Sequence, residues 1–236
     1  MINFSLLTGL FRATVGIILF SQTVNAAAQS NGLLYDPEPP ADSAYVRVIH
    51  ASHGSTVDVL IDGKTRVHNL AGGNASDYLV LANGKHTFAL QSEGKNTVLV
   101  SSTLEVDSGR AITVAFTALR ADTKPLVFED KANSNKLKAV LAVYHLDSKA
   151  GPLDVLTADG KTHVFNNIAA GSSSQLSVNP ITIELIAAKA GDKTAQARTS
   201  VAMAPGGTYS ILLLPGDGGK LIARSVQNKV ERYTGK

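Results

Sequence analysis

Histidine is the residue type in this chain best suited to metal binding or acid–base chemistry. Two of the six histidines, His50 and His53, lie three positions apart and could ligate one metal ion. A zinc site, however, requires three or four ligands held by a supporting shell of hydrogen bonds. We therefore predict no metal and no cofactor, with His50 and His53 as the weak candidates for a metal site. The remaining histidines are His68, His86, His145 and His163.

His50 has a counterpart because the chain repeats itself. His50-Ala51-Ser52 and His145-Leu146-Asp147 open two similar stretches about 95 residues apart. Both continue through a strand-like run, an Asp-Gly-Lys-Thr turn and a tail ending in glycine, with one residue inserted near Ala158. A repeat of this length makes two whole domains, since solenoid repeats span only about 20–50 residues. We predict that His50 and His145 are structural and bond a loop carbonyl.

Asp58 and Asp154 are equivalent carboxylates in the two stretches. A glycosidase needs two carboxylates about 5–9 Å apart, and one per repeat does not supply such a pair. We predict that each carboxylate instead bonds backbone amides at a sheet edge.

Gly63-Lys64-Thr65 and Gly160-Lys161-Thr162 resemble the end of a phosphate-binding loop. That loop needs another glycine five positions earlier, where this chain has Asp58 and Val155, and a helix behind it. We predict that both segments are hairpin turns.

Motifs for a nucleophile are missing. The sequence contains no Gly-x-Ser-x-Gly and no Gly-Asp-Ser, the motifs of α/β-hydrolases and of SGNH esterases. Gly171-Ser172-Ser173-Ser174 is predicted to be a loop between strands. We predict no catalytic residue.

Composition narrows the class of protein. The 236 residues include no cysteine, which excludes disulfides, thiolate metal ligands and thiol nucleophiles. Aromatic residues make up 6% and tryptophan is absent, so we expect no stacking platform for bases and no nucleic-acid partner. Residues 29–130 carry a net charge of −4 and residues 131–236 a net charge of +6. The basic second half could meet an anionic polysaccharide.

The first 28 residues resemble a secretory signal peptide, with a short apolar run from Ala13 to Phe20 and Ala26-Ala27-Ala28 before the expected cleavage site. The mature protein is therefore expected to be exported. Residues 29–43 form a leader rich in proline, which we expect to be extended.

The rest of the chain shows a period of two. Short runs such as Lys85–Leu90 and Ala111–Phe116 are separated by turn pairs, among them Asp62-Gly63, Asn83-Gly84 and Asp159-Gly160. This pattern is typical of antiparallel β-sandwiches, and Asp-Gly and Asn-Gly suit two-residue hairpins. We predict an all-β protein with two tandem antiparallel, Ig-like β-sandwich domains. The domains span residues 44–130 and 139–236, the second with a basic tail, and residues 131–138 form a linker.

The leader Gly32–Pro40 and the first strand Ser43–Val48 resemble the mature start of the AlgF family of alginate biosynthesis proteins, as does the Thr157–Thr162 turn. Val46–Ser52 and Val57–Val59 also resemble the signature of a widespread secreted β-sandwich module. The AlgF resemblance implies a periplasmic adaptor in the O-acetylation of alginate. Its implied partners are a membrane-bound O-acyltransferase and SGNH-type periplasmic acetyltransferases.

Three hypotheses follow. The first is a non-enzymatic adaptor for O-acetylation of an exopolysaccharide, either alginate or, in the same accessory role, cellulose. It would work by bivalent tethering, in which two linked domains raise the effective concentration of their partners. The second is a module that binds an anionic polysaccharide directly. The third is an acetyl carrier that uses His50 or the Ser172–Ser174 loop.

Overall fold

The structure is a computed structural model and describes residues 38–234. The predicted signal peptide and most of the leader lie outside this range. Within it, no helix has the length and apolar character needed to cross a membrane.

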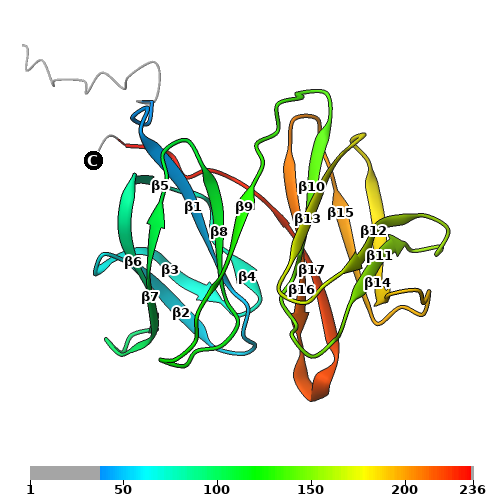
Figure 1. The fold of residues 1–236 in the computed structure, drawn as a ribbon, viewed down its shortest axis with the longest axis horizontal. Coiled ribbons are helices and arrows are strands. Elements are labelled where there is room, and N and C mark those ends of the chain that lie inside the picture. Colours follow the sequence, from blue (N-terminus) through cyan, green and yellow to red (C-terminus); the bar gives the residue numbers. More distant parts are fainter. Residues whose placement is uncertain (1–37, 235–236) are drawn as a thin grey trace, which may run out of the picture. The chain divides into compact units, whose positions relative to one another are not determined.

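Two sheets form the first sandwich (Figure 1). The inner sheet contains β1 (Ser43–His50), β4 (Asn74–Ala75), β5 (Leu79–Ala82), β8 (Ala111–Phe116) and β9 (Leu126–Asp130). The outer sheet contains β2 (Thr56–Ile61), β3 (Lys64–Ala71), β6 (Gly84–Ser92) and β7 (Val98–Val106). Buried residues of both sheets, including Val46, Val59 and Phe88, make one apolar core between them.

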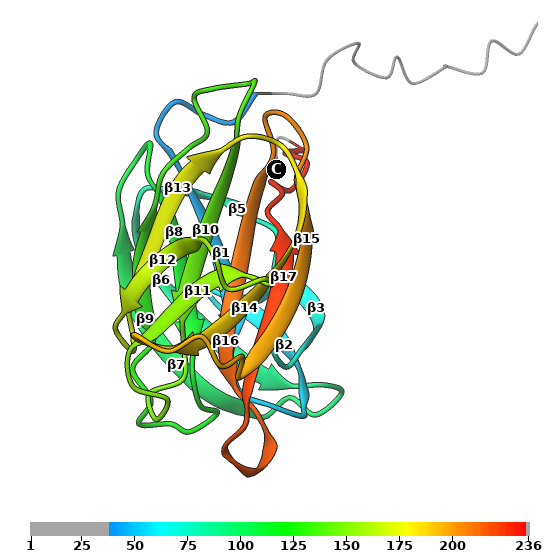
Figure 2. The same ribbon diagram turned by 90° about the vertical axis from the view of Figure 1, so that its right-hand side faces the viewer.

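The second sandwich repeats this plan (Figure 2). Its inner sheet contains β10 (Ala139–His145), β13 (Ser173–Val178), β16 (Thr208–Pro215) and β17 (Leu221–Gln227). Its outer sheet contains β11 (Leu153–Thr157), β12 (His163–Ile168), β14 (Thr182–Lys189) and β15 (Ala197–Ala202). A single short 3-10 turn, η1 (Asp217–Gly219), lies at the β16–β17 connection and is the only helical element in residues 38–234.

These four sheets confirm the predicted all-β fold with two sandwiches, but the pairing is not purely antiparallel. β1 pairs with β8 in parallel, and β10 pairs with β16 in the same way. The first strand of each sandwich is joined to its neighbour through the whole intervening module, and such a long connection permits a parallel pair.

The turn predictions were partly correct. Asp62-Gly63 is a two-residue hairpin turn, because Ile61 pairs with Lys64 and both turn residues have positive φ. Asn83-Gly84 is not a hairpin, because β5 and β6 belong to different sheets and the chain crosses between them here. Asp159-Gly160 lies in a hairpin, as predicted, but in a longer loop between the paired residues Leu156 and His163.

Asp58 and Asp154 bond backbone amides, as predicted, but the carboxylates do not lie at a sheet edge, because β2 and β11 each have a paired strand on both sides. Each lies where the pairing register shifts, and each accepts the N–H of an asparagine with positive φ. Asn69 donates to Asp58 at 3.0 Å and Asn167 donates to Asp154 at 2.6 Å. Asp154 also accepts the N–H of Gly191 at 2.9 Å. The carboxylates therefore stabilise the same β-bulge in both sandwiches.

The first strand of each sandwich is buried on both faces. In β1, Ala44, Val46 and Val48 point into the core of the first sandwich, and the alternate residues face the opposite way. That opposite face meets the inner sheet of the second sandwich in a third apolar cluster, here called the junction. The junction contains Ile49, Ala51, Ala115, Phe128, Ala142, Tyr144, Leu146, Leu212 and Leu214.

The segment after β17 leaves the second sandwich and returns to the first (Figure 1). Tyr78 donates its backbone N–H to Lys229 and accepts from Glu231, both at 2.8 Å. The Glu231 carboxylate also accepts from the backbone of Val80 at 2.7 Å and pairs with Arg66 at 2.6 Å. The basic tail therefore extends the inner sheet of the first sandwich.

Removing the two bulge carboxylates should lower the free energy of unfolding by different amounts. Asp154 keeps 6% of its side chain exposed and accepts two N–H groups, whereas Asp58 keeps 18% and accepts one. Because buried amides left without partners are costly, Asp154→Ala should lower the free energy of unfolding by about 1–3 kcal/mol and Asp58→Ala by less. Urea denaturation of the two variants measures this difference, and equal losses would contradict the prediction.

Candidate functional site

The two equivalent histidines occupy the structural position expected of them. His50 and His145 are fully buried. Nε2 of His50 lies 2.9 Å from the carbonyl oxygen of Ser55, and Nε2 of His145 lies 2.6 Å from that of Gly151. Each ring therefore donates to the loop that follows its strand. Burial lowers the pKa of His50, which favours the neutral ring.

The structure separates His53 from His50. The His50 ring faces the interior, whereas Nδ1 of His53 lies 3.3 Å from a carboxylate oxygen of the exposed Asp217. Across residues 38–234, no group of three or more His, Cys, Asp or Glu side chains is arranged to hold a metal ion.

Only Gly171 and Ser172 of the predicted serine loop lie outside a strand, because Ser173 and Ser174 begin β13. Among residues 38–234, no imidazole is hydrogen-bonded to the hydroxyls of these three serines. Ser172 donates its hydroxyl to the carbonyl of Ala169 at 2.6 Å, and Ser173 and Ser174 are exposed at the start of β13. The other histidines lie near carboxylates: His68 at 3.6 Å from Asp58, His86 at 2.6 Å from Asp62 and His163 at 3.6 Å from Asp154.

A buried arginine lies at the junction. Arg47 projects from β1 and its exposed fraction is 0%. Its Nε donates to Thr113 at 2.7 Å, its Nη2 to Ser210 at 2.9 Å and its Nη1 to Asn228 at 2.5 Å. Thr113 belongs to β8 of the first sandwich. Ser210 belongs to β16 of the second sandwich, and Asn228 directly follows β17. One guanidinium thus bonds both halves of the protein.

Two tyrosines and one carboxylate complete this network. The Arg47 Cζ lies 5.0 Å from the ring centroids of both Tyr78 and Tyr144, a distance suited to cation–π attraction. Both tyrosine hydroxyls donate to Asp130, Tyr78 at 2.8 Å, and Thr113 also donates to Asp130, at 2.5 Å. The Asp130 carboxylate is therefore linked to Arg47 through Thr113.

The tyrosines remain hydrogen-bond donors at neutral pH. Burial, the largest cause, raises the pKa of Tyr144 to about 12 and moves the pKa of Tyr78 still further upward. Both phenols therefore keep the proton that they donate to Asp130.

The network uses equivalent positions of the two halves asymmetrically. Arg47 pairs with Thr113 across β1 and β8, and the residue 95 positions later, Ala142, pairs with Ser210 across β10 and β16. Thr113 pairs in turn with Phe128, and Ser210 with Val226. Asp130 and Asn228, each two residues further on, are therefore equivalent. One half supplies Arg and Asp where the other supplies Ala and Asn, so the network holds one cation and one anion.

A groove of about 600 Å³ lies over this network. Tyr78, Asp130, Tyr45 and residues 228–233 of the tail contribute to its lining. Its three exposed lysines are Lys131, Lys136 and Lys229. The lining also contains Arg232 and the carboxylates of Asp130 and Glu231, so its basic side chains outnumber its acidic ones.

Sequence reasoning missed Arg47, Asp130 and the tail. The signal for Arg47 was a charge between Val46 and Val48, since a charge inside a strongly apolar strand is rarely buried without partners. The role of the tail left no such signal, because its contacts to Tyr78 are made by the backbone.

A family model described as "Alginate O-acetyl transferase AlgF" matches residues 17–210. The chain belongs to the AlgF family. The alginate biosynthesis protein AlgF of Pseudomonas aeruginosa is 30% identical over 206 residues, covering 87% of this chain and 88% of that protein. The AlgF protein of Pseudomonas syringae pv. tomato is 29% identical over 196 residues, covering 83% and 81%.

Among solved structures, that of the C-terminal domain of AlgF from P. aeruginosa is similar to this chain, with 29% identity and a TM-score of 0.33. It covers 39% of this chain and 100% of that domain.

Removing Arg47 should destabilise this AlgF-family protein strongly. Arg47→Ala introduces the residue found at the equivalent position, Ala142. Because it leaves Asp130 without its cation, it should lower the free energy of unfolding by about 3–5 kcal/mol. In an Asp130→Asn background the same change should cost about 1–3 kcal/mol less, because no carboxylate is stranded. Chemical denaturation of the four proteins measures this coupling. Arg110→Ala, which breaks the exposed pair with Glu129, serves as the control and should cost less than about 1 kcal/mol.

The lowered pKa of His50 predicts acid sensitivity. The unfolded state has the ordinary pKa of 6.5 and binds the proton first, so the free energy of unfolding should fall as the pH drops below about 6.5. His50→Gln keeps an N–H donor for Ser55 but does not titrate, and should lose part of this slope. Urea denaturation of His50→Gln and of the control His68→Gln is measured from pH 7.5 to pH 5 in steps of ~0.5 pH units. The control should retain the full pH dependence of the free energy of unfolding.

Proposed function

We propose that this chain is a non-catalytic periplasmic adaptor required for O-acetylation of an exopolysaccharide, with alginate as the polymer. Membership of the AlgF family supports a role in alginate biosynthesis. The adaptor would link a membrane-bound O-acyltransferase to SGNH-type periplasmic acetyltransferases.

The observation that carries this proposal is how the buried ionisable groups are used. Arg47 is inaccessible and its N–H groups bond protein atoms, so it offers nothing to an oxyanion of a substrate. His50 and His145 donate to loop carbonyls, and within residues 38–234 the one hydroxyl hydrogen-bonded to either ring is that of Ser52, at 3.4 Å from Nδ1 of His50. These groups hold the two sandwiches together and shape their loops.

A joined pair of sandwiches suits an adaptor. The apolar junction and the returning tail connect the halves along two separate sets of contacts. Residues 131–138 are also bonded to the second sandwich: Asn133 donates to the carbonyl of Gly207 at 3.3 Å, and the carbonyl of Lys138 accepts the N–H of Gly206 at 2.9 Å. Partners bound to such a body would meet at a fixed spacing, which raises their effective concentration more than a loose tether does.

The lysine-lined groove favours a second candidate function, direct binding of an anionic polysaccharide. Lys131, Lys136 and Lys229 would pair with uronate carboxylates, and Tyr45 would supply one ring surface. The binding would weaken with salt, because exposed charges are screened.

The adaptor proposal predicts the phenotype of a deletion strain. Deletion of the gene should abolish acetylation while polymer synthesis continues, because the proposed adaptor serves the acetylation step alone. Acetyl content and uronate content of the secreted polymer measure the two effects. Plasmid-borne wild type and His50→Gln should both restore acetylation, since His50 has no chemical role in an adaptor.

Fully acetylated polymer from the deletion strain would refute the adaptor. An adduct of about 42 Da on the purified protein after incubation with an acetyl donor would favour the acetyl carrier instead. Tight, salt-sensitive binding of mannuronate oligomers that is lost on changing the three groove lysines to glutamine would favour the polysaccharide module.

A further inference from the structure

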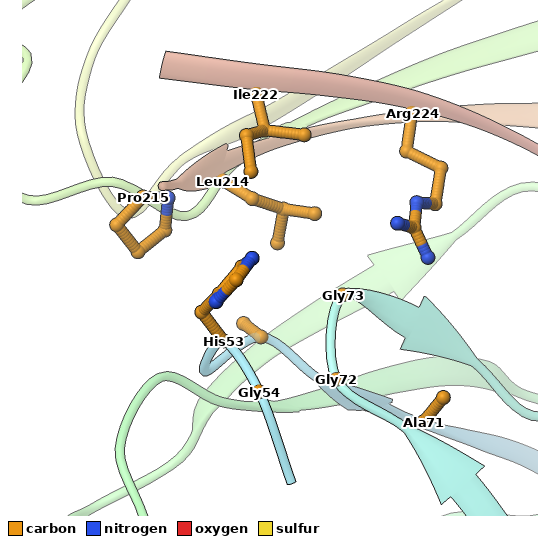
Figure 3. Close-up of a pocket in the computed structure, with 10 residues that line it drawn as sticks. His53, Gly54, Ala71, Gly72, Gly73, Leu214, Pro215, Ile222 and Arg224 are labelled. Carbon is orange, nitrogen blue, oxygen red and sulfur yellow. The ribbon is translucent and has the colours of Figure 1, made fainter. Parts of the chain in front are cut away.

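A second cavity, of about 250 Å³, lies at the junction and combines a cation with an aliphatic wall (Figure 3). His53 approaches it from the loop after β1, and Arg224 approaches it from β17. Figure 3 shows the imidazole and the guanidinium directed into the same space from opposite sides. Leu214, Pro215 and Ile222 form the apolar wall.

Arg224 is not fully used by the protein. The side chain is half-buried and donates one hydrogen bond, from Nη1 to the side-chain oxygen of Asn74 at 2.9 Å. Across residues 38–234 it has no ion-pair partner. A guanidinium carries five N–H donors in a planar fork that matches a carboxylate. A half-buried cation with spare donors and no counter-charge is therefore prepared for an anion.

The other half of the molecule shows what a purely structural residue does at this position. Phe128 and Val226 are equivalent, so Leu126, two residues before Phe128, corresponds to Arg224. Leu126 lies against Gly171, at 3.7 Å from the position of an added Cβ, as Arg224 lies against Gly73 at 3.6 Å. Leucine thus serves the packing role, and Arg224 adds a charge that packing does not need.

The same comparison holds for His53. The residue 95 positions after His53 is Ser148, so both basic groups of the cavity are replaced by neutral residues in the equivalent place. Nδ1 of His53 contacts Asp217, whose side chain is 88% exposed and lies at the tip of the β16–β17 hairpin.

Two glycines keep the cavity open. A Cβ on Gly72 would lie 2.5 Å from the carbonyl oxygen of Ser52, so only glycine lets the turn approach the loop after β1. Gly73 has φ +75°, and a Cβ there would lie 3.3 Å from Leu214 and 3.6 Å from Arg224. A side chain at Gly73 would therefore take up space beside the guanidinium.

We propose that this cavity binds a carboxylate of a partner protein, an Asp or Glu side chain whose neighbouring aliphatic residue lies on the Leu214–Ile222 wall. This inference rests on the proposed adaptor function and names one of its contact points. The cavity is smaller than the roughly 300 Å³ at which small-molecule sites begin, and no Phe, Tyr or Trp side chain lines it, so it fits one or two side chains better than a run of sugar rings.

The test is an NMR titration of the purified mature protein with two capped tripeptides, acetyl-Leu-Glu-Leu-amide and its glutamine counterpart. The glutamate peptide should shift the signals of Gly54, Gly72, Gly73 and the Arg224 side chain. The glutamine peptide should bind at least about tenfold more weakly, because a neutral amide lacks the charge that strengthens hydrogen bonds from a guanidinium.

The variant Arg224→Leu supplies the matched control, because leucine is the residue of the equivalent position and should preserve folding. It should lose the difference between the two peptides, and His53→Ser should reduce it. A mannuronate trimer is titrated in parallel. Equal shifts from both peptides, no response to the glutamate peptide, or a response in Arg224→Leu equal to that of the wild type would overturn the inference. A trimer that binds where the glutamate peptide does not would also overturn it and would make the cavity a sugar site.

The outcome remains separable from that of the adaptor proposal. If the cavity binds no carboxylate but the deletion strain loses acetylation, only this contact point is wrong. If the deletion strain keeps its acetylation, the adaptor is wrong whatever the cavity binds.

Discussion

A fully buried guanidinium is the constraint on which the arrangement of the two sandwiches depends. Removing an arginine from water is costly unless its charge and its donors are satisfied in place. Neither sandwich can do this alone: Thr113 and the link to Asp130 come from the first, and Ser210 and Asn228 come from the segment that forms the second. Separation of the halves would leave Arg47 with part of its partners, so the polar network favours the joined state. The surrounding apolar cluster contributes buried area to the junction. The hydrogen bonds of Arg47 are satisfied in only one arrangement of the two inner sheets.

Divergence of the two repeats explains how this network can be neutral. Two identical modules facing each other would bring two arginines and two aspartates to the junction. In this chain the position equivalent to Arg47 is Ala142, and the position equivalent to Asp130 is Asn228. One cation and one anion remain, and the amide oxygen of Asn228 accepts from the guanidinium without adding charge. The duplicated chain therefore has a junction that a symmetric pair of copies could not build.

Local chemistry was predictable from the sequence, whereas contacts between repeats were not. Ala111–Phe116 forms β8 with the predicted bounds, and the buried histidines and bulge carboxylates bond the backbone groups expected of them. Period two placed Arg47 on the face opposite Val46 and Val48, but a pattern within one strand does not say whether another sheet covers that face. Parallel pairing of β1 with β8 and backbone pairing of the tail with Tyr78 are also set by neighbours distant in sequence.

Internal repetition also separates residues that serve folding from residues that serve something else. His50 and His145 make the same bond in both halves, which is what a structural requirement of the module looks like. Arg47 and Arg224 both differ from their counterparts, Ala142 and Leu126, yet their surroundings differ in kind. The guanidinium of Arg47 bonds three side chains between two aromatic rings, so its difference is explained by the junction. Arg224 has one bond and a cavity beside it, so the protein itself does not account for its charge. A charge that the fold does not need, kept half-buried where leucine would pack, is best explained by a ligand.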